Sequence, residues 1–215
     1  MSKITFKPGT MLNPVPAVMV SCGDGDIKNI ITIAWTGIIN TDPPMTYVSV
    51  RKERYSHDII KRTGEFVINL TTEDLAFATD YCGVRSGRDV DKFKEQKLTP
   101  QESKVVKCPS IAESPVNIEC KVVEVKELGS HDMFMAEIVN VSVDEKLMDE
   151  NGRLCLDEAG LIAYNHGHYF ALKRNEIGRF GYSVMKPKTR KRLNAQRSRG
   201  SNKRHNSNSK TRRKK

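Results

Sequence analysis

Hydrophobic residues in the first third of the chain form short runs separated by turn residues, and this pattern predicts successive β-strands. Residues 17–22 are mostly apolar, which is typical of a buried strand. Residues 23–26 read Gly-Asp-Gly-Asp and favour a tight turn, because these residues tolerate positive φ. The strands expected in this part of the chain cover residues 17–22, 27–35, 45–51 and 65–70.

The segment 56–64 fits a short helix between two of these strands. Ser56 is a residue type that favours the N-cap, and Gly64 favours a left-handed stop. A helix capped by Ser56 directs its free backbone N–H groups and its positive end toward Arg51. The sequence therefore predicts an anion site at this helix start.

A second helix is expected further along the chain. Thr72 is its candidate cap, with acidic residues in the first turn, and the helix is expected to end at about Tyr81. Residues 82–89 are polar and predict a loop, and a short helix is expected to begin in 90–93.

The second half of the chain returns to a strand pattern. Residues 116–127 and 133–143 alternate and carry β-branched side chains, and the polar tip 129–132 between them predicts a hairpin. Residues 161–170 form the last segment of the chain that is rich in apolar residues. Sequential strands with tight turns and few helices favour a mainly β, antiparallel barrel with short peripheral helices over a doubly wound parallel sheet.

Charge divides the chain into two parts. Residues 186–215 hold 14 of the 36 Lys and Arg residues and no acidic residue, so the remainder is mildly acidic. We expect one domain over 1–183 and a disordered Lys/Arg-rich tail over 184–215, because the tail has too few apolar residues for a core. Two interpretations of the tail stay open: a solvated extension, or non-specific, salt-sensitive binding to polyanions.

Several classes of protein are disfavoured by what the sequence lacks. No segment has the roughly 18 apolar residues of a membrane helix, and no signal peptide is evident. The five cysteines form no CxxC, so we expect reduced thiols and a cytoplasmic protein. No Gly-rich nucleotide motif is present. His166-Gly167-His168 is a weak metal signal by itself, and no metal site is expected.

Four segments in order carry a resemblance to a known family. They are Asn-Ile-Ile-Thr-Ile-Ala-Trp at 29–35, Ser-Val-Arg-Lys-Glu-Arg-Tyr-Ser-His at 49–57, Asp-Tyr-Cys-Gly through Asp-Lys-Phe at 80–93, and Gly-Ser-His at 129–131. Together they resemble the flavin-reductase-like, FMN-binding split-barrel family, and their spacing is most similar to its flavoredoxin-like branch. The resemblance covers about residues 10–172. It implies a six-stranded Greek-key split barrel, usually a homodimer, with FMN near the subunit interface.

The resemblance also implies roles for particular residues. His131 matches the hairpin position on the nicotinamide side and is the catalytic candidate. Here Ser130 stands where the family has Asp, and this difference favours an electron carrier over an NAD(P)H-dependent enzyme. The implied cofactor-binding residues are Thr32, Ala34, Trp35 and Thr36 along the ring and ribityl chain, Arg51, Lys52, Tyr55 and Ser56 near the phosphate, and Ser86, Gly87, Asp91 and Lys92 in a closing loop.

The chemistry of these residue types agrees with a flavin site. Arg51 can bind a phosphate through two charge-assisted hydrogen bonds, and Lys92 can supply positive charge near the reduced ring. Trp35 fits a cofactor wall as well as a core position. Cys82 fits a buried small side chain better than a nucleophile, because no basic partner is evident.

The sequence therefore leads to one function and two alternatives. We expect an FMN-binding oxidoreductase that accepts hydride from NADH or NADPH and passes electrons to free flavin or to a redox-protein partner. The first alternative is a flavoredoxin-type FMN electron carrier with little NAD(P)H activity. The second is a nucleic-acid-binding protein that acts through its tail; the net acidity of the remaining residues argues against a basic groove.

Overall fold

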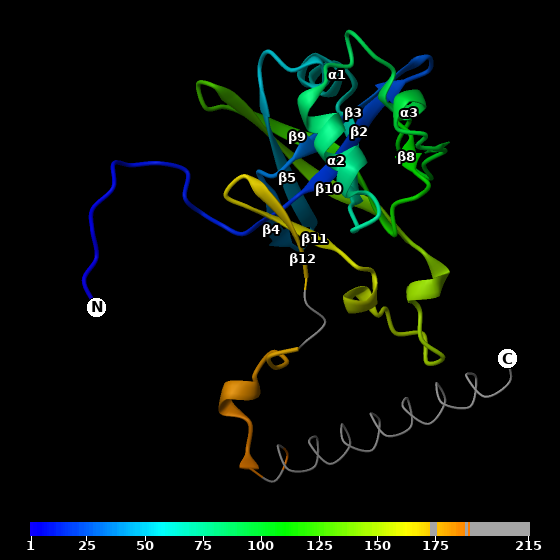
Figure 1. Cartoon of the computed structure of the whole chain (residues 1–215). Coiled ribbons are helices and arrows are strands. Elements are labelled where there is room, and N and C mark those ends of the chain that lie inside the picture. Colours follow the sequence, from blue (N-terminus) through cyan, green and yellow to red (C-terminus); the bar gives the residue numbers. More distant parts are fainter. Residues whose placement is uncertain (173–175, 188, 190–215) are drawn as a thin grey trace, which may run out of the picture. The chain divides into compact units, whose positions relative to one another are not determined.

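A computed structural model of the chain describes residues 1–172, 176–187 and 189 (Figure 1). The chain divides into two compact units, Met1–Arg174 and Asn175–Lys215. The predicted tail 184–215 lies mostly outside the described residues. In the described part of the second unit, Tyr182–Val184 forms one 3-10 turn. No helix among the described residues is long and apolar enough to cross a membrane.

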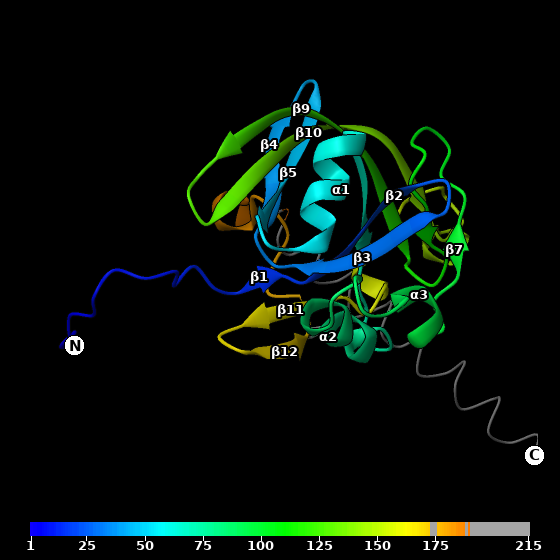
Figure 2. The same ribbon diagram turned by 90° about the horizontal axis from the view of Figure 1, so that it is seen from above.

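A curled, antiparallel seven-stranded sheet forms the body of the first unit (Figure 2). In order across the sheet its strands are β3 (Ile27–Ile33), β2 (Val18–Asp24), β6 (Glu65–Leu70), β9 (Val116–Glu127), β10 (His131–Val143), β5 (Pro44–Arg51) and β4 (Thr36–Thr41). The chain passes from β3 at one edge to β4 at the other through Ala34 and Trp35 alone. The two edges therefore meet at this point, and the backbone N–H of Ser49 on β5 donates to the Trp35 carbonyl at 3.0 Å. The sheet is an antiparallel split barrel, as the sequence predicts, with seven strands where the resemblance implies six.

The inner face of the curled sheet holds the main core. Helix α1 (Tyr55–Thr63) lies against the curl and buries Ile59 and Ile60 among strand residues such as Val20 and Phe66 (Figure 2). Removing this apolar surface from water stabilises the barrel and fixes α1 against it. The start of α1 is thereby held beside the ends of β3 and β5.

The outer face of β2 and β3 is also covered. Helices α2 (Ala76–Val84) and α3 (Lys92–Glu95) pack there, and Ile30 of β3 contacts a cluster that includes Cys82 and Phe93. Because Ile31 faces the inner core while Ile30 faces these helices, β3 is buried on both sides. This explains why the segment is apolar without clear alternation.

Smaller elements complete the first unit. The predicted run 161–170 is itself a hairpin, which turns at His166 and Gly167 with φ of 48° and 91°. The remaining strands are β1 (Val15–Pro16), β11 (Ile162–Asn165) and β12 (His168–Ala171) in a three-stranded sheet, and β7 (Pro100–Gln101) with β8 (Ser110–Ile111) in a two-stranded sheet. Short 3-10 helices cover Glu145–Leu147 and Leu156–Glu158. All five cysteines are free thiols, as expected.

The predicted helix boundaries need two corrections. Gly64 ends α1 with φ of 68°, which confirms the left-handed stop. The prediction that Ser56 caps α1 is wrong, because Arg54 occupies the N-cap position and Ser56 lies buried within the first turn. A turn in which the Arg54 N–H donates to the Arg51 carbonyl starts the helix earlier than the capping preference indicates.

The start of α2 was also predicted incorrectly. Leu75, not Thr72, precedes the helix, and Thr72 instead forms a bridge with Leu161. The helix continues to Val84, beyond the predicted end at Tyr81. Burial of Cys82 against β3 provides the packing that extends the last turn, and tertiary contacts of this kind are invisible to local propensity.

Candidate functional site

Two adjoining cavities lie where β3, the end of β5 and the start of α1 meet. The larger has a volume of about 240 Å³ and the smaller about 160 Å³, and both are lined by Ile31 and Arg54. The larger is also lined by Asn29, Glu53, Tyr55, Ser56, Cys82, Arg85, Ser86, Gly87 and Lys92. The smaller is also lined by Thr32, Ile33, Ala34, Trp35, Ser49, Val50, Arg51 and His131.

The larger cavity is cationic and rich in hydrogen-bond donors. Arg54 comes from the start of α1 and Arg85 from the end of α2. Within the described part of the chain neither guanidinium group has an ion-pair partner, in contrast to Arg62, which binds Asp24 with two hydrogen bonds of 2.9 Å. Two unpaired guanidinium groups beside a helix start form a site suited to a phosphate-like anion.

A close contact between β3 and the first turn of α1 shapes this cavity. The Asn29 side chain donates a hydrogen bond of 2.7 Å to the Ser56 hydroxyl. A Cβ atom on Gly87 would lie 2.1 Å from the Asn29 side-chain oxygen. Glycine at position 87 therefore allows the loop backbone to approach the cavity without displacing Asn29.

Lys92 closes the inner end of the larger cavity. The residue is 4% exposed, and its ammonium group donates to the carbonyls of Ile30 at 2.7 Å and Cys82 at 2.8 Å. Burial lowers the pKa of Lys92 from 10.5 to about 8. Burial also raises the pKa of the Cys82 thiol to about 11, which agrees with its predicted role as a buried small side chain.

The smaller cavity has an aromatic wall. The rings of Trp35 and His131 lie with their centroids 4.7 Å apart, and Trp35 is 42% exposed. His131 stands opposite Arg51 in the pairing of β10 with β5. Burial and the positive charge of Arg51 hold the pKa of His131 below its ordinary value, although Glu53 opposes them. This cavity can hold a flat, partly apolar ring system.

Arg88 links the loop after α2 to the start of α1. The Arg88 guanidinium donates to the Glu53 carbonyl at 3.0 Å and lies 5.2 Å from the centre of the Tyr55 ring. It also lies 3.6 Å from a carboxylate oxygen of Asp58. Arg88 thus fastens the loop that carries Ser86 to the start of α1.

Ten of the thirteen residues that the sequence indicates line one of the two cavities. Arg51 lines the smaller cavity with the aromatic wall, and Lys92 lines the larger cationic one. The others are Thr32, Ala34, Trp35 and His131 in the smaller cavity, and Tyr55, Ser56, Ser86 and Gly87 in the larger.

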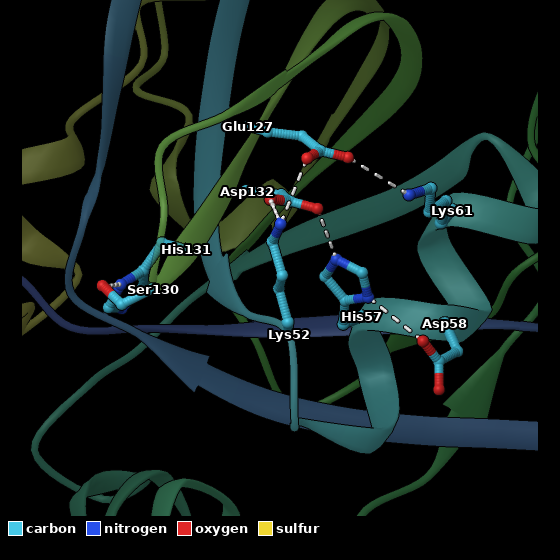
Figure 3. A network of polar contacts seen from close by, with 8 residues as sticks. All are labelled: Lys52, His57, Asp58, Lys61, Glu127, Ser130, His131 and Asp132. Carbon is cyan, nitrogen blue, oxygen red and sulfur yellow. Dashed lines mark hydrogen bonds and ion pairs between the residues drawn. The ribbon is translucent and has the colours of Figure 1, made fainter.

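Thr36, Lys52 and Asp91 line neither cavity. The Thr36 hydroxyl donates to the Tyr47 carbonyl at 2.5 Å, and Asp91 caps α3 by accepting from the Lys94 N–H at 3.2 Å. Lys52 turns away from the cavities, and its ammonium group lies near two carboxylates, as Figure 3 shows.

Asn29, Arg54 and Arg85 line the larger cavity but are not among the site residues that the sequence indicates. Arg85 falls in the segment 82–89, which was interpreted as a loop, so its place at a helix end was not expected. Asn29 opens the motif at 29–35, yet its role depends on a contact with Ser56, which is 27 residues away in sequence.

The comparisons with known proteins agree with this geometry. In fold, the chain is a split barrel like the flavoredoxin of Desulfovibrio vulgaris (Miyazaki F), with a TM-score of 0.78 and 30% identity over 85% of this chain and all of that one. The flavoredoxin of Methanosarcina acetivorans gives a TM-score of 0.77 at 25% identity, over 86% of this chain and all of that one.

The sequence comparison identifies the family. Residues 10–173 match the flavin reductase like domain, so the chain belongs to the flavin reductase-like family. An uncharacterized protein of Archaeoglobus fulgidus is 36% identical over 121 residues, which cover 56% of this chain and 68% of that protein.

Proposed function

We propose that this protein binds FMN and acts as a flavin-dependent oxidoreductase. The observation that carries this proposal is the pairing of a cationic cavity with an aromatic one, joined at Ile31 and Arg54. A molecule with a phosphate at one end and a flat ring at the other matches this pair. Membership of the flavin reductase-like family and the 30% identity to a flavoredoxin support the same choice.

The donors of the larger cavity fit the phosphate group of FMN. Arg54, Arg85 and the Ser56 hydroxyl would hold its oxygens, and the Lys92 ammonium would add a charge from the inner end. Arg88 would keep the covering loop in place. Because these groups belong to packed helices and to a fixed loop, little ordering is required when the ligand binds.

The smaller cavity fits the isoalloxazine ring. Trp35 would provide one wall, the backbone beside Ala34 would offer hydrogen bonds to the ring edge, and Arg51 would supply positive charge near it. FMN supplies reversible two-electron chemistry when it is bound. His131 lies beside the same space and would contact the nicotinamide of NADH or NADPH, as the resemblance implies.

The visible spectrum tests this proposal directly. Purified protein reconstituted with FMN is expected to show the flavin absorption bands, and anaerobic NADH or NADPH is expected to bleach them. Free flavin or a redox protein would then accept the electrons and restore the bands. If FMN leaves both the melting temperature and its own fluorescence unchanged, the proposal is overturned.

A second candidate is a flavoredoxin-type electron carrier. Ser130 in place of the family's Asp favours it, as does the 30% identity to the flavoredoxin of D. vulgaris. A carrier would bind FMN but would be reduced far faster by a protein donor than by NADH or NADPH. Bleaching by the nicotinamides at a catalytic rate would exclude this candidate.

Two partners remain proposals. A homodimer would bring a second subunit over the exposed edge strand β4, where Ile38 and Ile39 face solvent, and light scattering would give the mass.

Residues 186–215 carry 14 basic side chains and would bind polyanions weakly. Deleting them is expected to abolish heparin binding and to leave FMN affinity unchanged.

A further inference from the structure

A network of charged side chains is centred on the buried residues Asp132 and His57, and none of its members lines either cavity. Asp132, on β10, is 1% exposed, and its Oδ2 atom lies 2.9 Å from Nε2 of His57 on α1. Its Oδ1 atom lies 3.4 Å from the Lys52 ammonium and accepts no hydrogen bond within the described residues. Figure 3 shows how these side chains converge from three elements.

The same network reaches the other strand of the hairpin. Glu127, at the end of β9, lies 3.2 Å from Lys52 and 3.9 Å from Lys61. Asp58 lies 3.1 Å from the second ring nitrogen of His57. Both strands next to the hairpin tip are therefore tied to α1 and to the turn before it (Figure 3).

Asp132 is ionised in this setting. Burial opposes its ionisation, but the hydrogen bond from His57 and the ion pair with Lys52 outweigh that effect, so the pKa of Asp132 lies below its ordinary value. A carboxylate can only accept hydrogen bonds, so Nε2 of His57 must carry a proton. The charge holds its two partners in place, because a buried carboxylate without them would be costly.

Successive side chains on a strand point to opposite faces. Asp132 faces the interior, so His131 is directed toward the smaller cavity, where its ring meets Trp35 at 4.7 Å. Only the exposed tip 128–130 lies between Glu127 and His131 in the chain. The position of the His131 ring thus depends on its contact with the Ser130 hydroxyl, 2.9 Å from Nδ1, and on how firmly the buried neighbour anchors the strand.

We propose that Asp132, held by His57 and Lys52, is a positioning residue that fixes His131 against Trp35 in the smaller cavity. The geometric part of this proposal does not depend on any ligand. Its functional part rests on the proposed function, in which His131 meets the nicotinamide.

Trp35 is the only tryptophan of the chain, so its emission reports this contact without a label. A protonated imidazole quenches indole emission, and a titration of the emission therefore follows His131. The charged groups around that ring are Arg51, Glu53 and Arg54. Wild-type protein should show a midpoint below about 6.5, the ordinary value for histidine, and His131→Gln should remove the transition.

Asp132→Asn breaks the network while it keeps the shape of the side chain. Both partners of Asp132 are donors, and an amide offers only one acceptor, so one contact must fail. We expect the midpoint of the emission titration to rise toward about 6.5 and its amplitude to fall. An unchanged midpoint and amplitude would overturn the proposal.

Glu119→Gln is the matched control. Glu119 is another buried carboxylate of the same hairpin, and it accepts from the backbone N–H groups of Lys104, Val105 and Val106 at 2.7–3.1 Å, away from both cavities. It should lower the melting temperature without moving the emission titration. An equal shift in this variant would mean that Asp132 has only a general structural role, and would overturn the proposal.

A second pair of variants covers the case in which Asp132→Asn does not fold. His57→Gln keeps an N–H donor toward Asp132 and should preserve the wild-type titration, whereas His57→Leu should shift it. Equal behaviour of the two would contradict the positioning role.

The flavin reaction gives a separate measurement. Asp132→Asn should slow reduction by NADH or NADPH by about 10- to 100-fold, as displacement of a positioned group does, while the Kd for FMN stays unchanged. An unchanged rate of reduction would overturn the functional part. If wild-type protein binds no FMN, the proposed function fails, and the emission titration still decides whether Asp132 positions His131.

Discussion

The side chain of Asn29 donates a hydrogen bond of 2.7 Å to the hydroxyl of Ser56, across the wall of the larger cavity. The contact joins β3 to the first turn of α1, two elements whose neighbouring residues also line the smaller cavity. It explains why Ser56 is buried in the helix and does not cap it. It also couples the cavity to Gly87, whose backbone packs against the same asparagine.

Gly87→Ala is expected to weaken FMN binding by about fivefold. A Cβ atom 2.1 Å from the Asn29 oxygen must displace that side chain and break its hydrogen bond to Ser56, which is worth about 1 kcal/mol. Titration of FMN fluorescence gives the Kd. In a protein that already carries Asn29→Ala, Gly87→Ala should weaken FMN binding little further, because the side chain that the new Cβ would meet is gone. Fully additive effects would show that Gly87 acts independently of Asn29.

Arg85→Ala should distinguish FMN from riboflavin, which lacks the phosphate. Arg85 lines only the larger cavity, so its loss should weaken FMN binding by about 1.5–3 kcal/mol and leave riboflavin binding unchanged. Arg51→Ala should affect both ligands alike, because Arg51 lines only the smaller cavity. Arg62→Ala removes a paired arginine elsewhere and serves as the control. A selective loss of FMN binding in Arg51→Ala would restore the phosphate role that the sequence indicates for that residue.

FMN affinity should depend on pH through Lys92. Burial lowers the pKa of Lys92 to about 8, and a nearby phosphate dianion favours the charged ammonium. Affinity is therefore fully present below this pKa and decreases as the pH rises through it, by about tenfold one pH unit above it. Isothermal titrations across this range measure the change. The Lys92→Met variant should bind FMN more weakly, and its affinity should not change with pH over this range. If the affinity of the variant still depends on pH, another group titrates.

Arg88→Ala should release FMN faster. The guanidinium fastens the loop over the larger cavity through Glu53, Tyr55 and Asp58. Losing a cation–π contact and an exposed ion pair, worth about 1 kcal/mol together, should raise the dissociation rate by about fivefold. Stopped-flow displacement with excess riboflavin measures this rate. A changed association rate with an unchanged dissociation rate would contradict the role of Arg88 in holding the loop over bound FMN.

Much of the fold follows from local patterns. The alternation in 116–143 predicts the β9–β10 hairpin, because a strand with one buried face must alternate. Gly64 predicts the end of α1, because only glycine adopts positive φ without cost. Four short motifs in order were specific enough to indicate the family and most residues of the two cavities.

Which of these residues act together was decided by the tertiary structure. Arg54 and Arg85 are 31 positions apart and meet only because α1 and α2 pack on opposite sides of β3. Lys52 lies beside Arg51 in sequence, yet its ammonium turns to the buried carboxylate of Asp132. Local preferences act over a few residues, whereas a cavity or a buried charge pair depends on packing between distant strands. The sequence by itself therefore determined the family and the strands of the main sheet other than β4. The closure of the barrel decided which side chains share a cavity.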